Sequence, residues 1–248
     1  MSIGQNNSIA AFYEFADSSR HSSTSDKRRV HSLLTLLEPG QSDSFLDIGC
    51  YDGTKTAMIA GYLRSEIVYG VDFLRERLQQ AMARGISAIN VDLNATTPLP
   101  FNDRTFDFIF VGDVIEHLFS PDYLLQEISR LLRPGGYAVL TTPNLASWRN
   151  RIVLLFGWQP FMTEVSTNYR VGNPYALDGV PSGHIRIFSP RAMRELPEKY
   201  GLRVECLGGQ ILSSAPQGIV GHLSQWVDYA VYAAYPTLCD ELVVKLRR

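Results

Sequence analysis

The sequence has few cysteines, almost no net charge and no long apolar run. Its three cysteines lie far apart and form no C-x-x-C pair, so neither a disulfide framework nor a metal site is expected. The same scarcity of cysteine favours a reducing, cytoplasmic location. With 23 basic and 25 acidic residues the net charge is −2, which gives no indication of a nucleic-acid surface. The apolar run at residues 152–156 is too short to span a bilayer, and residues 1–11 lack the pattern of a signal peptide. What remains is a globular protein whose apolar content of 45% supports a sizeable core.

Two common nucleotide-loop patterns are also absent from the stretch around which the chain is organised. Residues 45–54 are typical of a strand, a tight loop with Gly49 and Gly53, and the start of a helix. Tyr51 stands where a G-x-G-x-x-G dinucleotide loop requires glycine, and no phosphate P-loop pattern is present. A strand–loop–helix junction still directs backbone N–H groups to the carboxyl edge of a parallel sheet, where ligands bind. The alternative is an ordinary turn between a strand and a helix.

Strand and helix patterns alternate five times before residue 142, which predicts an α/β fold with a parallel sheet covered on both faces. Residues 157–187 have no clear period, and a loop of this length is usually functional or mobile. Strands are expected at 44–48, 67–71, 86–91, 106–111, 137–141, 202–207 and 242–246. Helices are expected at 54–64 and 73–84, from Ser120-Pro121 to the Pro134-Gly135-Gly136 turn, and at 145–156, 189–200 and from 220 onward.

Four short stretches, in order and at matching spacing, resemble class I S-adenosylmethionine-dependent methyltransferases of the small-molecule type, such as those of quinone, glycan and natural-product modification. The resemblance covers residues 30–142 well and 184–208 more loosely, and the family normally has glycine in place of Tyr51. The four stretches are Leu46-Asp47-Ile48-Gly49-Cys50-x-x-Gly53, Gly70-Val71-Asp72, Leu99-Pro100-Phe101-Asn102-Asp103-x-x-Phe106-Asp107 and Leu132-Arg133-Pro134-Gly135-Gly136.

The resemblance implies a Rossmann-like, seven-stranded, mostly parallel sheet with helices on both faces and inserted lid segments. We expect one methyltransferase domain over residues 1–248. Within it, residues 1–42 form an N-terminal helical lid, 43–142 the cofactor-binding core, 143–188 an acceptor-side insertion, and 189–248 the C-terminal part of the core with an inserted helix.

The same resemblance implies S-adenosylmethionine as the cofactor and assigns its contacts. Gly49 and Gly53 permit a close backbone approach, and Asp72 at the end of a strand accepts hydrogen bonds from a ribose diol. The alternative for Asp72 is capping of the helix that follows it. Asp47, an acidic residue in an apolar strand, anchors the loop or holds the ammonium group of the donor.

The remaining cofactor-side residues follow the first four strands. Asp92 and Leu93 match the place where the family contacts adenine, although Asp92 is also typical of an ordinary loop. Phe73 lies against the adenosine or covers the core. Asp113 holds the methionine end or the geometry of its loop, and Cys50 supplies a small side chain in the glycine loop.

On the acceptor side, the residues with the best claim to proton transfer are His117, beside Glu116, and His184. The alternatives are that His117 caps a strand end and that His184 holds the lid by hydrogen bonds. Aromatic residues of the insertion either line an acceptor pocket or pack the lid on the sheet; they are Trp148, Phe156, Trp158, Phe161, Tyr169 and Tyr175.

The sequence therefore predicts methyl transfer to a small-molecule acceptor, at a hydroxyl oxygen, by in-line displacement. Neither a nucleic-acid partner nor a membrane span is expected, and a homodimer is possible because Tyr229, Tyr232 and Tyr235 recur along the last helix. A catalytically inactive partner subunit that keeps the fold is the second hypothesis. A nicotinamide oxidoreductase is the third, and Tyr51 disfavours it.

Overall fold

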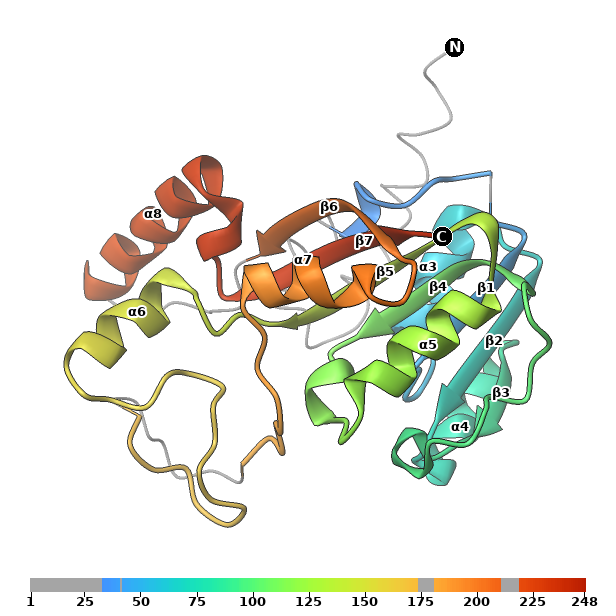
Figure 1. Ribbon diagram of the computed structural model, residues 1–248, viewed down its shortest axis with the longest axis horizontal. Coiled ribbons are helices and arrows are strands. Elements are labelled where there is room, and N and C mark those ends of the chain that lie inside the picture. Colours follow the sequence, from blue (N-terminus) through green and yellow to red (C-terminus); the bar gives the residue numbers. More distant parts are fainter. Residues whose placement is uncertain (1–32, 41, 174–180, 211–218) are drawn as a thin grey trace.

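The computed structural model describes residues 33–40, 42–173, 181–210 and 219–248, with the side chains of 219–225 left out. Figure 1 shows a central twisted sheet with helices on both of its faces, and a pair of helices, α6 and α8, to one side. The α/β fold class expected from the alternating strand and helix patterns is therefore confirmed.

The sheet has seven strands in the order β3-β2-β1-β4-β5-β7-β6. The pairs among β1 to β5 are parallel, whereas β7 is antiparallel to both of its neighbours, so the sheet is mostly parallel as expected. The strands are β1 (Ser44–Ile48), β2 (Ile67–Asp72), β3 (Ser87–Asn90), β4 (Phe106–Gly112), β5 (Leu132–Pro143), β6 (Arg203–Gln210) and β7 (Glu241–Arg247).

Two of the helices begin at the Ser-Pro pairs that the sequence marks as starts. The Ser120 hydroxyl accepts a hydrogen bond from the Tyr123 N–H, and the Ser189 hydroxyl accepts one from the Ala192 N–H. The α-helices are α3 (Thr54–Leu63), α4 (Arg75–Ala83), α5 (Pro121–Leu131), α6 (Trp148–Leu155), α7 (Pro190–Glu198) and α8 (Ile219–Ala234). Short 3₁₀ helices are η1 (Leu93–Ala95), η2 (Ile115–His117) and η3 (Pro236–Leu238).

Two apolar clusters, one on each face of the sheet, form the core. On one face the buried leucines and isoleucine of α5 and Met193 of α7 pack against strand residues such as Ile109. On the other face Ile59 and Leu63 of α3 pack with residues 33–37 against Phe108. Covering both faces buries β1 completely and most of β4, which explains their continuous apolar runs, whereas β2 and β3 toward the edge of the sheet are partly exposed.

Several boundaries differ from those expected. β5 begins at Leu132, directly after α5, so the Pro134-Gly135-Gly136 turn lies inside the strand, at an irregularity in its pairing with β4. Helix α6 begins at Trp148 rather than at 145 because Asn144 accepts the Ala146 N–H and Ser147 caps the helix through the Asn150 N–H.

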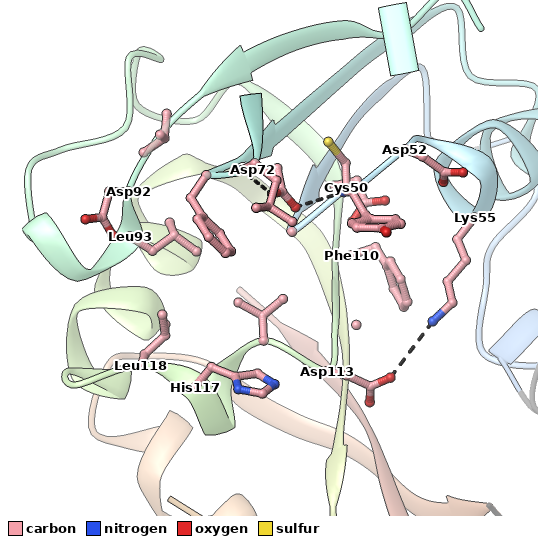
Figure 2. A pocket seen from close by; sticks show the side chains of 18 of the residues that line it. Cys50, Asp52, Lys55, Asp72, Asp92, Leu93, Phe110, Asp113, His117 and Leu118 are labelled. Carbon is pink, nitrogen blue, oxygen red and sulfur yellow. Dashed lines mark hydrogen bonds and ion pairs between the residues drawn. The ribbon is translucent and has the colours of Figure 1, made fainter. Parts of the chain in front are cut away.

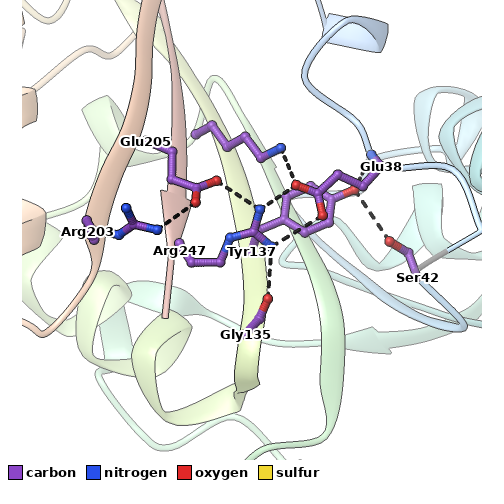
Figure 3. A network of polar contacts seen from close by, with 8 residues as sticks. Glu38, Ser42, Gly135, Tyr137, Arg203, Glu205 and Arg247 are labelled. Atoms are coloured by element: carbon purple, nitrogen blue, oxygen red, sulfur yellow. Dashed lines mark hydrogen bonds and ion pairs between the residues drawn. The ribbon is translucent and has the colours of Figure 1, made fainter.

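The amino-terminal edge of the parallel strands carries a paired charge network (Figure 3). The Glu38 carboxylate accepts hydrogen bonds from Lys245, at 2.5 Å, and from Arg247, which also pairs with Glu205 at 2.8 Å. Both cations lie over the ring of Tyr137, with the Lys245 nitrogen 4.7 Å from the ring centroid, and the Tyr137 hydroxyl accepts the Glu38 N–H. This network joins the first described segment to β5, β6 and β7.

The expected lids are described only in part. Most of the N-terminal lid lies outside the described residues, and so do positions 174–180 of the acceptor-side insertion. Residues 157–173 and 181–187 contain no helix or strand. The Glu164 carboxylate joins these two segments by accepting the N–H groups of Ser182, Gly183 and His184. Within the described ranges, no helix combines the length and the apolar content needed to cross a membrane.

Candidate functional site

A pocket of about 1110 Å³ lies over the carboxyl edge of β1, β2 and β4. The register pairs Ile48 with both Val71 and Val111, so the residues that follow these three strands meet at one edge. Figure 2 shows Asp72, Asp92, Asp113 and His117 around this space; Asp72 ends β2, Asp92 follows β3, and Asp113 and His117 follow β4. The volume lies at the upper end of the roughly 300–1,000 Å³ typical of small-ligand pockets.

The glycine loop begins at a position that only glycine can occupy. Gly49 has a φ of 85°, and a Cβ there would lie 2.3 Å from a methyl carbon of Val114. Tyr51 also adopts a left-handed conformation, with a φ of 50°, which is the conformation that favours glycine at this place in the resembled family. Tyr51 lines the pocket and is 45% exposed, and the Arg77 guanidinium lies 5.0 Å from its ring centroid.

Asp72 lines the pocket and holds two turns together. One of its carboxylate oxygens accepts the Tyr51 N–H at 2.9 Å and the other accepts the Leu74 N–H at 2.8 Å. The alternative role considered for Asp72 is the N-cap of the following helix. That position is taken by Leu74, which precedes the first residue of α4. Each carboxylate oxygen has two lone-pair directions, so Asp72 retains capacity to accept hydrogen bonds from a ligand.

Asp47 is a buried carboxyl group in the pocket wall, only 2% exposed. The Thr56 hydroxyl donates to Oδ2 at 2.5 Å, while Oδ1 has no hydrogen-bond partner among the described residues. Burial raises the pKa of Asp47 to about 7, with the Thr56 hydrogen bond and Lys55 opposing the rise and Asp72 adding to it. A carboxyl group in this setting favours a cationic ligand group, which would restore its charge.

Cys50 and Gly53 contribute to the loop through packing. Burial raises the pKa of the Cys50 thiol to about 12, and a Cβ at Gly70 would lie 2.6 Å from its sulfur, so Cys50 fills the space that Gly70 leaves. Gly53 does not line the pocket; a Cβ there would lie 2.8 Å from the Cα of Ala81 in α4. Gly53 is therefore required by the contact between helix and loop.

Phe73, Asp92 and Leu93 line another wall of the pocket. Phe73 is 68% exposed, so it does not cover the core. The Asp92 carboxylate accepts the Asn94 N–H at 2.9 Å and starts η1, which is the ordinary loop role considered for it. Its position on the pocket leaves the adenine contact open as well.

Asp113 lies at the end of β4 with a φ of 57° and lines the pocket. The Thr141 hydroxyl donates to Asp113 at 2.9 Å, and the Lys55 ammonium lies 3.9 Å from its other oxygen (Figure 2). Lys55 and Thr56 both come from the first turn of α3, and sequence reasoning found neither. Their only signal is that they follow the glycine loop directly.

The two histidines expected on the acceptor side meet, although 66 residues separate them. Their ring centroids are 4.8 Å apart. His117 lines the pocket and its Nδ1 lies 3.1 Å from the Gly183 carbonyl oxygen, whereas His184 lies behind it with Nδ1 2.8 Å from the Met162 carbonyl oxygen. Burial lowers the pKa of His184 below its ordinary value, and nearby His117 adds to this while the Met162 carbonyl opposes it.

Of the aromatic residues predicted in the insertion, those that the structure describes do not line this pocket. Phe156, Trp158 and Tyr169 are 76%, 47% and 70% exposed, and the Trp148 indole N–H donates to Asp228 of α8. Tyr175 lies outside the described residues. Ser182 and Val114 line the pocket instead, and no periodicity in the sequence pointed to either of them.

The family described as "Methyltransferase domain" matches residues 22–207 of this chain. A malonyl-acyl-carrier-protein O-methyltransferase of Marinomonas sp. is 30% identical over 46% of this chain, and a demethylmenaquinone methyltransferase of Bacillus mycoides is 29% identical over 50% of it. These matches cover 43% and 55% of the two relatives, so the chain spans about half the length of the curated proteins that it matches.

Solved structures share the fold at low sequence identity. An S-adenosylmethionine-dependent methyltransferase of Mesorhizobium loti superposes with a TM-score of 0.58 at 17% identity, covering 88% of this chain and 96% of the other. The cyclase SpnF superposes with a TM-score of 0.57 at 18% identity, covering 99% and 95%. At these identities the similarity concerns the fold alone.

Proposed function

The chain belongs to the methyltransferase domain family, and on this basis we propose that it transfers a methyl group from S-adenosylmethionine to a hydroxyl oxygen of a small-molecule acceptor. The observation that carries this proposal is the position of the Asp72 carboxylate. It is buried, lines the pocket and is held by two backbone N–H groups at the edge where the Gly49 loop turns.

The residues of the pocket fit the donor. Gly49 provides backbone without a side chain, and the Asp47 carboxyl has an oxygen without a hydrogen-bond partner among the described residues, suited to an ammonium group. Asp72 would accept the ribose hydroxyls, and Phe73, Asp92 and Leu93 would border the adenine. Asp113 and Cys50 would border the methionine end, while Gly53 would keep the loop against α4.

When bound, S-adenosylmethionine supplies a methyl group already activated by a sulfonium. The chain then has to align the acceptor with that methyl group, exclude water and accept a proton. His117 is the imidazole that lines the pocket, so it would hold the acceptor hydroxyl and take its proton, with His184 fixing its position. The name of the demethylmenaquinone methyltransferase supports a small-molecule acceptor, and that of the malonyl-acyl-carrier-protein O-methyltransferase supports an oxygen as the methylated atom.

Titration calorimetry with S-adenosylmethionine and with S-adenosylhomocysteine tests donor binding first. An assay of S-adenosylhomocysteine formation against a panel of phenols, enols and carboxylic acids then tests transfer. Absence of donor binding would contradict the proposal. Donor binding without turnover on any acceptor would favour the second hypothesis, an inactive subunit that keeps the fold. It would equally favour a different reaction on the same fold, as the similarity to a cyclase illustrates.

The helices α6 and α8 support a homodimer. Trp226, Tyr229, Tyr232 and Tyr235 of α8 and the turn after it are 69%, 39%, 37% and 65% exposed, and Leu155 at the end of α6 is 82% exposed. Aromatic side chains exposed together are typical of interfaces. Light scattering coupled to size-exclusion chromatography should give twice the chain mass of 27.8 kDa, and a monomer at every concentration would contradict the dimer. A cytoplasmic location stays a prediction.

A further inference from the structure

Three side chains with metal-binding atoms converge beside the donor pocket. One candidate ligand atom from each of Glu116, His117 and His184 lies within 4.8 Å of the other two. Glu116 and His117 belong to η2, and His184 comes from the insertion. The backbone holds the two segments together, because the N–H groups of Ile185 and Arg186 both donate to the Glu116 carbonyl oxygen, at 2.8 and 3.0 Å.

The second contacts of these side chains have the pattern of metal ligands. A metal-binding histidine usually donates its other ring N–H to a carbonyl or carboxylate, which fixes the ring and presents a lone pair to the ion. Here the Nδ1 atoms of His117 and His184 each lie within hydrogen-bond distance of a backbone carbonyl, so Nε2 of each ring is the atom that carries the lone pair. The Thr142 hydroxyl donates to the Glu116 carboxylate at 3.0 Å.

We propose that Glu116, His117 and His184 bind a divalent transition-metal ion such as Zn²⁺. Two imidazoles and one carboxylate match Zn²⁺ or Fe²⁺ better than Mg²⁺ or Ca²⁺, which prefer oxygen ligands alone. The candidate ligand atoms lie within 4.8 Å of one another, and bonds of about 2.0–2.1 Å in a tetrahedral site need them roughly 3.3 Å apart, so ion binding would bring them closer by up to about 1.5 Å. The cysteine spacing, on which the expectation of no metal rested, has no bearing on such a site.

The location gives the ion a role that rests on the proposed function. His117 lines the pocket with Asp113 and Ser182, so an open coordination position there faces the acceptor space. A hydroxyl bound to the ion has a lowered pKa and releases its proton to water. Its oxygen forms the bond to the methyl carbon, the carbon–sulfur bond breaks, and that electron pair stays on sulfur. His117 then positions the ion and is no longer the base itself.

Zinc binding is measured without any activity assay, by titrating the chelator-treated 248-residue chain with ZnSO₄ in a calorimeter. One ion per chain is expected. His117→Ala and His184→Ala should each lower the affinity by more than about 100-fold, and Thr142→Val by about 10-fold. Glu195→Gln removes an exposed carboxylate on α7 and should leave the affinity unchanged. Equal affinity in all variants, or no binding to the wild type, would overturn the site.

Cobalt substitution keeps the test valid if a variant folds poorly. Co²⁺ added to the wild type should give the intense visible absorption of a four- or five-coordinate ion, and an excess of Zn²⁺ should remove it. A spectrum like that of aqueous Co²⁺ would count against the site. A protein that binds Zn²⁺ but transfers no methyl group would leave the site standing and refute the proposed function. Transfer at the same rate with and without chelator would refute the role in activating the acceptor.

Discussion

At the amino-terminal edge of the sheet the Glu38 carboxylate is paired with two cations, whereas at the carboxyl-terminal edge the Asp47 carboxyl is buried against a single hydroxyl. Burial raises the pKa of Glu38, but the hydrogen bonds from Arg247 and Lys245 more than offset it, so that pKa lies below its ordinary value. Burial with little compensation raises the pKa of Asp47 instead, to about 7. The Glu38 carboxylate is paired where it joins segments, whereas the Asp47 carboxyl keeps one oxygen without a hydrogen-bond partner among the described residues, at the edge where a ligand is expected.

Left-handed conformations occur at both edges, because Arg64 and Arg104, in the connections that enter β2 and β4, also have a positive φ. At the pocket, Tyr51 and Asp113 adopt left-handed conformations that cost non-glycine residues roughly 1–2 kcal/mol each. At the opposite edge, the network around Tyr137 links strands through ordinary contacts between side chains. Strained backbone conformations and buried carboxyl groups with few hydrogen bonds are retained only when the rest of the fold is stable enough to offset their cost. The paired edge and the two packed faces therefore supply the stability on which the pocket depends.

The largest effect is expected from the imidazoles at the pocket. His117→Ala should lower turnover by about 100-fold or more while donor affinity stays near that of the wild type. His184→Ala should match it if the two rings share an ion, and should mainly raise the acceptor KM if His184 only holds its segment. Steady-state kinetics with Glu195→Gln as the control decide this. Normal turnover in both histidine variants would mean that alignment alone carries the reaction.

The next effect concerns Asp72. Asp72→Ala should weaken binding of S-adenosylmethionine by about 1.5–3 kcal/mol, because hydrogen bonds to a charged group are lost. Asp103→Ala, which removes a carboxylate that is 71% exposed and pairs with Arg130, is the matched control and should bind normally. Titration calorimetry measures both. Unchanged affinity in Asp72→Ala would remove the ribose role.

The opposite edge should respond in stability and not in binding. Glu38→Gln should lower the free energy of unfolding by about 1–2 kcal/mol near pH 7 and leave donor affinity intact. Because the folded-state pKa of Glu38 is depressed, its contribution is present above the ordinary value of 4.5 and is lost as the pH falls through the folded-state pKa. The difference in the free energy of unfolding between wild type and variant, measured by urea unfolding, should therefore be smaller at pH 3.5 than at pH 7. A difference that persists at low pH would contradict the pairing.

The smallest effect is a proton exchange at Asp47. With a pKa of about 7, part of the donor-free protein holds this proton at pH 6.5, and an ammonium group bound beside Asp47 favours the carboxylate. Donor binding should therefore release less than one proton at pH 6.5 and almost none from this group at pH 9. Calorimetry in buffers of different ionisation enthalpy measures the release, and Asp47→Asn should abolish it. Release that is the same at both pH values would exclude Asp47 as the source.

The part of the pocket proposed to hold the donor could be predicted from the sequence because its residues directly follow strand ends. Apolar runs that end in Gly49, Asp72 and Asp92 determine both the element and the edge where the next residue lies, and all three line the pocket. Lys55 and Thr56 were missed because the helical pattern of α3 does not show that its first turn faces the pocket.

The acceptor side depends on contacts between distant segments. The meeting of His117 with His184 is set by hydrogen bonds from Ile185 and Arg186 to Glu116, which no local pattern encodes. Residues 157–187 have no period, so the sequence could not show that Trp158 and Tyr169 point to the surface.

A crystal structure with bound S-adenosylhomocysteine would show whether this edge of the sheet is the donor site. The ribose hydroxyls should lie on the Asp72 carboxylate, the ammonium group at Asp47, and the sulfur toward His117. A ligand seated elsewhere, or one whose ribose makes no contact with Asp72, would contradict the assignment of this edge as the donor site.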